Sequence, residues 1–526
     1  MARSLADITR VRPIIGMEVH VQLATKAKVF SGAPNPAHDG VDGAEPNTLI
    51  DPVVLGLPGS LPVLNLGAVE LALRVGAALG CRIGGEAAWD RKSYFYPDMP
   101  KAYQISQYDR PLCGEGVFEL PGLDERGGPD FSKPATRIRV TRAHLEEDAG
   151  KLLHEAPGGH AIDFSIVDYN RAGAPLLEIV TEPDFPGAAE AVLFARALRD
   201  ICRAVGATRG VMQKGHMRFE PNVNVELTLA DGSTVRTPIV EVKNLNSFRA
   251  LKGAIEFEVA DQPRRWAADG RVHGRGAKAT RGWDDAAQRT IPQREKEDAH
   301  DYRYFPEPDL PVIVVDEAWA SRVRAELPEL PLAAAKRFCA ELGIPAAEAV
   351  ALAEEPGLRK LTNTALSVLQ ALIGPSGGKT LANILLQQCA KHANEAGVQI
   401  HELGIAPEHI GAVAALRFKG AVSANAIDAL LLAGRGVETP VDPTQALAYV
   451  ERLARDAGLL VVRDDAAMDA WIDKAFAAHP QAAADVKAGK MQAIGRLVGE
   501  AMKAAGGSAD AKAVREAILK RLGGPA

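Results

Sequence analysis

The stretch Gly16-Met17-Glu18-Val19-His20-Val21-Gln22-Leu23 alternates apolar and polar residues. Successive side chains of a β-strand point to opposite faces, so this alternation predicts a strand that carries Glu18, His20 and Gln22 on one face. A glutamate and a histidine held two residues apart on one face indicate a bound partner. A divalent cation that carries phosphate is the candidate.

A second acidic stretch, His144-Leu145-Glu146-Glu147-Asp148-Ala149-Gly150-Lys151, is also set in strand-like sequence. Glu178 stands alone in the apolar run Leu176–Val180, and Glu220 lies in Arg218–Asn224. An isolated carboxylate is costly to bury unless it is paired. Each acid can pair with a distant base, but like charges gathered on one sheet need a cation. The four segments therefore favour a divalent ion such as magnesium.

Short β-type runs dominate residues 11 to about 260, for example Ile138–Thr141 and Val223–Leu227. Because these strands cluster and do not alternate with helices, the pattern predicts an α+β domain with a mostly antiparallel sheet. One amphipathic helix interrupts the strands, with apolar residues at steps of three or four. These residues are Val192, Ala195, Leu198, Cys202 and Val205.

The second half of the chain is different in composition. Residues 250 to 300 are polar and charged, which predicts a solvated helix or a mobile connector that ends in Arg294–Asp298. Past residue 316 the chain is rich in Ala and Leu and reads as helical, with a turn near Gly404–Pro407 between two helical blocks. In the last forty residues basic side chains outnumber acidic ones, which indicates either a solvated face or contact with a phosphate backbone. The basic residues are Lys487, Lys490, Arg496, Lys503, Lys512, Arg515, Lys520 and Arg521.

Composition excludes several classes of protein. The 526 residues are too many for one core, and the net charge of −6 is too mild for a nucleic-acid polycation. The five cysteines are scattered without a CxxC pair, so neither a disulfide framework nor a thiolate zinc site is expected. The N-terminus leads into no apolar signal core, and no run reaches the ~18 apolar residues of a membrane helix. We expect a cytoplasmic, multidomain protein.

Three further segments carry recognisable patterns. Asp90–Tyr108 concentrates tyrosines with Arg and Lys, which predicts a rigid polar loop that either packs on its own aromatics or recognises a phosphate or carboxylate. Alternation places Glu241 and Lys243 on one strand face, where a cross-strand salt bridge is expected. The segment Gly374–Thr380 is not a phosphate-binding loop, because Ile373 stands where that motif requires glycine and the preceding residues read as helix.

Taken together, these segments resemble the B subunit of the tRNA-dependent amidotransferase, the GatB family, nearly from end to end. Long motifs in the right order make the resemblance specific. The segments that carry it are Gly16–Leu23, Gly43–Thr48, Asp90–Gln107, His144–Lys151, Leu176–Asp184, Glu241–Phe248, Asp301–Asp309 and Arg496–Lys503.

The resemblance implies an ATP-dependent carbon–nitrogen ligase with glutamine as amido donor. Such an enzyme converts misacylated Glu-tRNA(Gln) or Asp-tRNA(Asn) into the correct amide through an acyl phosphate. A glutaminase partner, the A subunit, supplies the ammonia, and a small C subunit completes the heterotrimer. The implied architecture is an antiparallel-sheet cradle domain over 1–300, a helical domain over 301–405 and a YqeY-like tRNA-binding tail domain over 406–526.

The resemblance also implies roles for individual residues. Glu18, His20, Glu147 and Glu178 correspond to the catalytic residues that hold magnesium, with Glu220 as a further ligand. The ATP-binding side would include Glu146, Lys92, Lys101 and Arg218, and the two lysines match basic residues near the place where ammonia enters.

The chain departs from the family pattern in two places. Some members carry a zinc knuckle built from two cysteine pairs, but the matching stretches here, Phe30–Ala33 and Ile50–Leu55, contain no cysteine, so we expect no zinc site. Where the family often has Met-Glu-Glu-Gly, this chain has Met212-Gln213-Lys214-Gly215, so an acid is absent.

Two rival functions stay open. The Gln213-Lys214 departure is compatible with a non-catalytic tRNA-binding scaffold whose metal site has decayed. Another ATP-dependent carboxylate–amine ligase that acts on a small molecule is the second rival, and the basic tail argues against it. The sequence does not distinguish Glu-tRNA(Gln) from Asp-tRNA(Asn) as the substrate.

Overall fold

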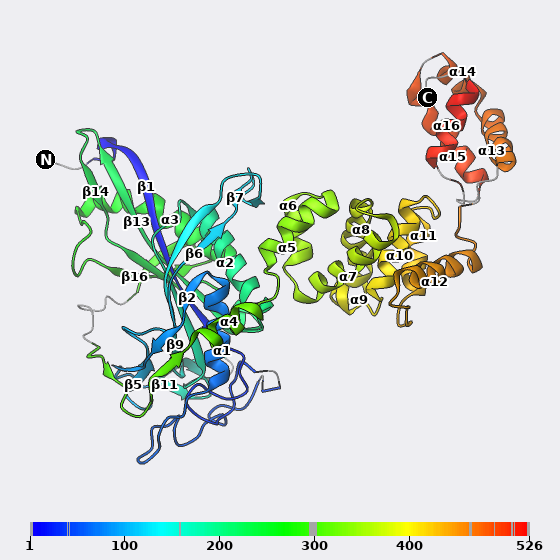
Figure 1. Ribbon diagram of the computed structural model, residues 1–526. Coiled ribbons are helices and arrows are strands. Elements are labelled where there is room, and N and C mark those ends of the chain that lie inside the picture. Colours follow the sequence, from blue (N-terminus) through cyan, green and yellow to red (C-terminus); the bar gives the residue numbers. More distant parts are fainter. Residues whose placement is uncertain are drawn as a thin grey trace. The chain divides into compact units, whose positions relative to one another are not determined.

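The computed structural model describes residues 4–38, 40–41, 43–156, 159–293, 302–461, 465–488, 490–505, 509 and 511–522 (Figure 1). The chain divides between Leu332 and Ala333 into two compact units. Unit 1 combines a large sheet with helices, and the described elements of unit 2 are helical. The predicted α+β class is confirmed, whereas the predicted domain boundaries near 300 and 405 stay predictions.

A ten-stranded sheet forms the centre of unit 1, in the order β17-β16-β15-β13-β1-β12-β9-β6-β2, with β14 paired to β13. Adjacent strands run antiparallel except for the parallel pair β15 and β16. The strands are β1 (Ile8–Gln22), β2 (Cys81–Ile83), β6 (Cys113–Leu120), β9 (Thr136–Glu147), β12 (Pro175–Thr181), β13 (Met217–Leu229), β14 (Thr234–Arg236), β15 (Val240–Lys243), β16 (Ala279–Asp284) and β17 (Arg289–Pro292).

The alternation in β1 decides which face of the sheet is covered. Met17, Val19 and Val21 are fully buried, whereas Glu18 and His20 on the other face are half-buried. Helices α1 (Leu66–Ala78), α2 (Ala188–Ala204) and α3 (Phe248–Asp269) pack on the apolar face and share one core with it (Figure 1). The predicted strand and amphipathic helix are thus both confirmed, and the polar face is left for chemistry.

The charged region after residue 250 is not a connector over its described part. It forms α3, β16 and β17, and the two strands extend the main sheet. The helix alternative is confirmed over Phe248–Asp269, but the helix is not wholly solvated: Glu258 is fully buried and accepts hydrogen bonds from Arg265, from Gln262 and, at 2.5 Å, from Thr290. Residues 294–301, the end of the predicted connector, lie outside the described residues.

The segment predicted as a rigid loop is a β-hairpin. β4 (Asp90–Ser93) and β5 (Tyr103–Ser106) pair with each other, and β18 (Phe305–Pro306) adds to β4. Arg91 holds the three strands together, because it binds Glu307 at 2.7 Å and lies over the Tyr103 ring at 4.4 Å. β5 packs on β9, so this hairpin borders the polar face of the main sheet. The other small sheets pair β3 (Gly85–Ala87) with β19 (Ile313–Val315), β7 (Gly122–Leu123) with β8 (Pro129–Asp130), and β10 (Lys151–Ala156) with β11 (His160–Asp168).

Helix α4 (Glu317–Ala325) packs on α1 within unit 1. Unit 2, which follows in the chain, is built from short helices. Helix α10 packs on α7 and α12, and α13 to α16 share a separate core that contains Ile472, Leu497 and Ile518. No helix of the described chain has the length and apolar character needed to cross a membrane. The helices are α5 (Pro331–Phe338), α6 (Ala346–Ala353), α7 (Pro356–Ile373), α8 (Gly378–Asn383), α9 (Ala390–Ala396), α10 (Pro407–Phe418), α11 (Ala426–Ala433), α12 (Pro443–Asp456), α13 (Asp465–Ala478), α14 (Pro480–Lys487), α15 (Ile494–Ala504) and α16 (Ala511–Leu522).

Candidate active site

Four neighbouring strands bring the acidic segments of the sequence together on the polar face. His20 of β1 lies opposite Glu178 of β12, and Glu178 lies opposite His144 of β9. On the other side of β1, Glu18 lies opposite Glu220 of β13. We call these residues the acid–histidine cluster: Glu18, His20, His144, Glu146, Glu178 and Glu220.

The two histidines lie between the carboxylates of the cluster. His20 Nε2 is 3.6 Å from Glu18 Oε1, 3.5 Å from Glu178 Oε2 and 4.0 Å from Glu146 Oε1. His144 Nε2 is 3.6 Å from Glu178 Oε2 and 3.8 Å from Glu146 Oε2. Two triads therefore share His20: one with Glu18 and Glu220, the other with Glu146 and Glu178.

The pKa values show how strongly the cluster is coupled. Burial and then the charge of Glu178 raise the pKa of Glu18 to about 7. Burial disfavours the His20 cation, but the hydrogen bond and charge of Glu178 outweigh that effect and raise the pKa of His20 to about 9. Burial opposes the Glu178 anion too, yet the charges of His144 and His20 hold the pKa of Glu178 well below its usual range. The cluster therefore concentrates negative charge, which the His20 imidazolium offsets.

These donors fit a divalent cation. Carboxylate oxygens with an imidazole nitrogen suit magnesium or a first-row transition ion. His20 Nδ1 is buried and has no hydrogen-bond partner in the described chain. Each triad holds its possible ligand atoms within 4.8 Å of one another. Glu18, His20, Glu146, Glu178 and Glu220 are thus the residues that could hold an ion.

Basic residues flank the cluster on both sides. Lys243 of β15 binds Glu220 at 2.8 Å across the strands and Glu241 at 3.0 Å along its own strand, which confirms the expected cross-strand salt bridge. On the hairpin side, Lys92 lies 4.6 Å from the centre of the Tyr302 ring. Burial opposes the Lys92 cation, but Glu146 and the nearby tyrosines raise its pKa. Anionic ligands would thus meet fixed positive charge on either side.

Glu147 and Lys101 lie apart from the cluster. Because adjacent residues of a strand face opposite ways, Glu146 joins the cluster and Glu147 does not. Lys101 Nζ is 2.5 Å from Glu147 Oε1, and the Ile105 N–H donates to the same oxygen at 2.9 Å. Lys28, which is fully buried, lines a small pocket with this pair. The structure therefore brings together Glu18, His20, Glu178, Glu146 and Glu220 of the predicted set, but it does not bring Glu147 to them.

Arg218 lies opposite His20 in the register of β13 and binds Asp148 at 2.6 Å. Gln22 also donates to Asp148, at 2.8 Å. Burial would raise the pKa of Asp148, but Arg218 and Arg171 hold it at about 2. Arg218 therefore lies beside the cluster with its positive charge already paired with Asp148. Gln213 and Lys214, the departing pair, are exposed in the short 3-10 turn Met212–Lys214 before β13.

Three residues of the site, His144, Asp148 and Lys243, have no individual role in the prediction from sequence, although His144 and Asp148 belong to the acidic stretch that favoured a cation site. His144 could have been found, because alternation places it on the same face as Glu146. Lys243 was expected only in a salt bridge, since the pairing of β15 with β13 is not visible in the sequence.

Comparisons with known proteins agree with this arrangement of motifs. The GatB/GatE catalytic domain family matches residues 13–321, and the GatB domain family matches residues 368–522. The chain belongs to the GatB family. Members of this family that are named as the B subunit of aspartyl/glutamyl-tRNA(Asn/Gln) amidotransferase are similar over nearly their whole length. The protein of Deinococcus radiodurans is 41% identical, with 97% of this chain and 99% of that protein covered. The protein of Burkholderia vietnamiensis is 40% identical (98% and 100% covered), and that of Anaeromyxobacter sp. is 39% identical (97% and 98% covered).

Proposed function

We propose that this GatB-family chain is the catalytic B subunit of a tRNA-dependent amidotransferase that converts Glu-tRNA(Gln), Asp-tRNA(Asn) or both into the corresponding amides. The single observation that carries the proposal is the acid–histidine cluster on the polar face of the sheet. The relatives that share the full length of the chain bear the matching name.

The chemistry needs a site of this kind. A carboxylate is a poor acceptor for ammonia, because oxide would have to leave. In the proposed reaction the side-chain carboxylate of the aminoacyl group attacks the γ-phosphorus of ATP, and ADP leaves. Ammonia then attacks the acyl carbon and phosphate leaves, which gives the amide. Two anions must meet in the first step, so their charge must be neutralised.

The residues of the chain would divide this work. Glu18, His20, Glu146, Glu178 and Glu220 would hold magnesium, which supplies charge neutralisation to the phosphates when it is bound. Lys92 and Lys243 would orient the anionic groups from the two sides of the cluster. Arg218 would remain paired with Asp148 and fix the end of β13.

We assign Glu147 and Lys101 to the path of ammonia. The pair is buried, and it lies at the hairpin that borders the site, where the Ile105 N–H of β5 donates to Glu147 and the Ser106 hydroxyl of β5 donates to Glu146 of the cluster. The partners in this proposal are the glutaminase (the A subunit), the small C subunit and misacylated tRNA, in the cytoplasm. The proposed parts of the chain are a cradle domain over 1–300, a helical domain over 301–405 and a tRNA-binding tail over 406–526.

Two isosteric substitutions test the catalytic assignment. In the complex assembled with its partner subunits, we expect Glu18→Gln and Glu178→Gln each to lower the amidation rate roughly 100-fold or more, because a charged ligand to the ion is lost. Glu119→Gln is the matched control, since Glu119 is exposed on β6 of the same sheet. The measurement is amide formation on both misacylated tRNAs over a range of magnesium concentrations.

The same assay separates the rival functions. Wild-type rates in both cluster variants would contradict the catalytic assignment and favour a tRNA-binding scaffold. Amidation of free glutamate or aspartate, with neither tRNA as a substrate, would favour a small-molecule ligase.

A further inference from the structure

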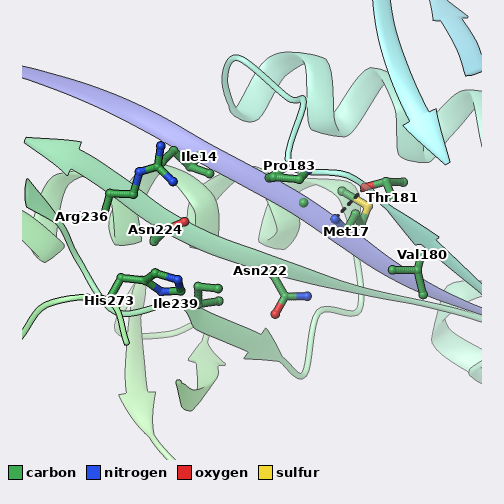
Figure 2. Close-up of a pocket in the computed structure, with 11 residues that line it drawn as sticks. Ile14, Met17, Val180, Thr181, Pro183, Asn222, Asn224, Arg236, Ile239 and His273 are labelled. Atoms are coloured by element: carbon green, nitrogen blue, oxygen red, sulfur yellow. Dashed lines mark hydrogen bonds between the residues drawn. The ribbon is translucent and has the colours of Figure 1, made fainter. Parts of the chain in front are cut away.

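The two ends of the acid–histidine cluster differ in the charge that they offer. At the end toward Gly16 and Val180 lies a cavity of about 310 Å³ (Figure 2). Arg236 is the one lining residue with a fixed charge, and that charge is paired with Glu226 at 3.0 Å. At the other end of the cluster lies the hairpin of β4 and β5, which carries Lys92. The hairpin side is therefore the place to look for unpaired positive charge.

Lys92 differs from the other cations beside the cluster in having no paired carboxylate among the described residues. Its Nζ makes neither an ion pair nor a hydrogen bond within the described part of the chain. Its three N–H groups are therefore available to an anionic ligand. The other cations are engaged: Lys243 with Glu220 at 2.8 Å, Lys101 with Glu147 at 2.5 Å, Arg218 with Asp148 at 2.6 Å, and Arg142 with Nδ1 of His144 at 3.3 Å.

The ring of Tyr302 is the group that Lys92 contacts. The ammonium nitrogen lies 4.6 Å from the ring centre, within the roughly 6 Å over which an aromatic face attracts a cation. The Tyr302 carbonyl accepts a hydrogen bond at 2.9 Å from the N–H of Ser93, the residue after Lys92. This backbone bond ties the segment that carries the ring to the strand that carries the ammonium group.

A series of aromatic contacts holds Tyr302 in place. Tyr304 meets Tyr302 edge to face with the ring centres 6.2 Å apart, and it stacks on Tyr108 at 4.6 Å. Between the two tyrosines, Arg303 has a φ of 45°, a left-handed conformation that is unfavourable for a residue with a side chain. Such a conformation persists only where the surroundings determine it, so the placement of the Tyr302 ring is specific.

The hairpin brings Lys92 beside Glu146 of the cluster. On β5 the Ser106 hydroxyl donates to Glu146 at 3.1 Å. Gln104, which lies opposite Lys92 in the register, donates to the Glu147 carbonyl at 2.7 Å. These two bonds fasten the hairpin to β9. Burial opposes the Lys92 cation, and Glu146 is the foremost of the groups that raise its pKa.

We infer that Tyr302 is a positioning residue for Lys92: its ring holds the ammonium group beside Glu146 and leaves the N–H groups free for an anionic group of the reactants. The inference rests on the proposed function, in which a side-chain carboxylate and the phosphates of ATP meet at the cluster. A lysine has a flexible four-carbon stem that can turn toward solvent. A carboxylate partner would restrain it but cancel its charge, whereas an aromatic face restrains it and leaves the charge in place.

A double-mutant cycle tests whether Tyr302 acts through Lys92. In the complete complex, we expect Lys92→Met to lower kcat/KM for the misacylated tRNA roughly 100-fold and Tyr302→Leu to lower it roughly tenfold. Because the ring has nothing to hold once the ammonium group is gone, the double variant should lose no more than Lys92→Met alone. A loss of roughly 1,000-fold in the double variant, the product of the two single losses, would overturn the inference, and so would an unchanged rate in either single variant.

A conservative variant separates the ring of Tyr302 from its hydroxyl. Tyr302→Phe keeps the aromatic face and should stay within about twofold of the wild-type rate. A loss as large as that of Tyr302→Leu would overturn the inference, because it would assign the effect to the hydroxyl. Fluorine atoms on the ring of Tyr302→Phe weaken its attraction for a cation with little change of shape. The rate should fall with each fluorine even if Tyr302→Leu does not fold, and a rate that is independent of fluorination would also overturn the inference.

Tyr96→Leu is the matched control. Tyr96 is an exposed ring on the connection between β4 and β5, and it contacts the Tyr94 ring at 6.1 Å. This variant should keep the wild-type rate, and a loss equal to that of Tyr302→Leu would overturn the specific role of Tyr302. Failure of the proposed function gives a different result, in which the wild-type complex itself forms no amide on either tRNA.

Discussion

His20 is the residue on which both triads of the cluster depend. It contacts carboxylates from three strands, and its pKa of about 9 follows from that anionic surrounding. A cation that binds between Glu18 and Glu178 replaces the charge that the imidazolium supplies. If the proposed magnesium binds there, it would replace protons at the site, and neither state would leave buried carboxylates without a counter-charge.

Lys28 is a fully buried lysine outside the cluster. Its Nζ donates to the Ala172 carbonyl at 2.6 Å, but burial still lowers its pKa from 10.5 to about 8. Since the unfolded chain holds this proton more tightly, the protein should gain stability as pH rises from about 8 to 10.5, by up to about 3 kcal/mol. Lys28→Met should lose this gain, which thermal melting across that pH range would measure.

Lys26→Met is the control for this prediction, because Lys26 is exposed two residues away. It should keep the pH dependence of the wild type. Equal pH dependence in wild type and Lys28→Met would mean that Lys28 is charged in the folded protein throughout this range.

Local alternation made part of the cluster predictable at the residue scale. Glu18 and His20 share a face because strands have a period of two, and the same rule separates Glu146 from Glu147. The family resemblance groups Glu147 with the metal ligands, and the strand geometry does not support that grouping. Lys92 could not be placed from sequence, because its position depends on the packing of a hairpin on β9.

At the scale of elements, the prediction from sequence erred mainly where charged residues are buried in pairs. Helix α3 looked like a solvated segment because Glu258 and Arg265 are charged, yet they are paired with each other against the sheet. The two stretches without the expected cysteines, Phe30–Ala33 and Ile50–Leu55, show apolar packing and not polar pairing. Ala33 and Val54, one from each stretch, are buried together in a small apolar cluster. Hydrophobic packing thus occupies the two stretches that the resemblance matches to cysteine pairs.

One substitution can test the close contact between helices α7 and α10. A methyl group at Gly411 of α10 would lie 2.6 Å from the Ala365 carbonyl oxygen and 2.9 Å from Val368 Cβ, both on α7. Gly411→Ala should therefore destabilise unit 2 by about 1–3 kcal/mol, which thermal or urea unfolding would detect. Gly499→Ala in α15 is the control, because open space surrounds that position, and it should be neutral or stabilising by about 0.5–1 kcal/mol. Equal stability of the two variants would contradict the close helix contact.

At the scale of the whole molecule, the proposed catalytic site and the proposed tRNA-binding residues belong to different units of the chain. The cluster lies in unit 1, whereas the basic residues of the tail lie on α14 to α16 and the adjoining turn in unit 2. Lys487, Arg496, Lys503, Arg515 and Lys520 are exposed and make no ion pair within the described chain. Val514 and Ile518 of α16 are buried in the separate core of α13 to α16. Composition alone did not decide whether these basic residues form an ordinary solvated surface or bind a phosphate backbone.

Two truncations distinguish these alternatives and test where the tail begins. Removal of residues 462–526 takes away the α13–α16 core and spares the packing of α10 and α12 on α7. We expect the shortened protein, in the complete complex, to retain its melting temperature and to bind tRNA more weakly. Its affinity should also depend less on salt, by about 0.9 in the log–log slope for each phosphate contact that is lost. Removal of residues 406–526 also strips α10 from α7, so its melting temperature should fall. An unchanged tRNA affinity and salt slope after the first truncation would assign tRNA binding to other parts of the complex.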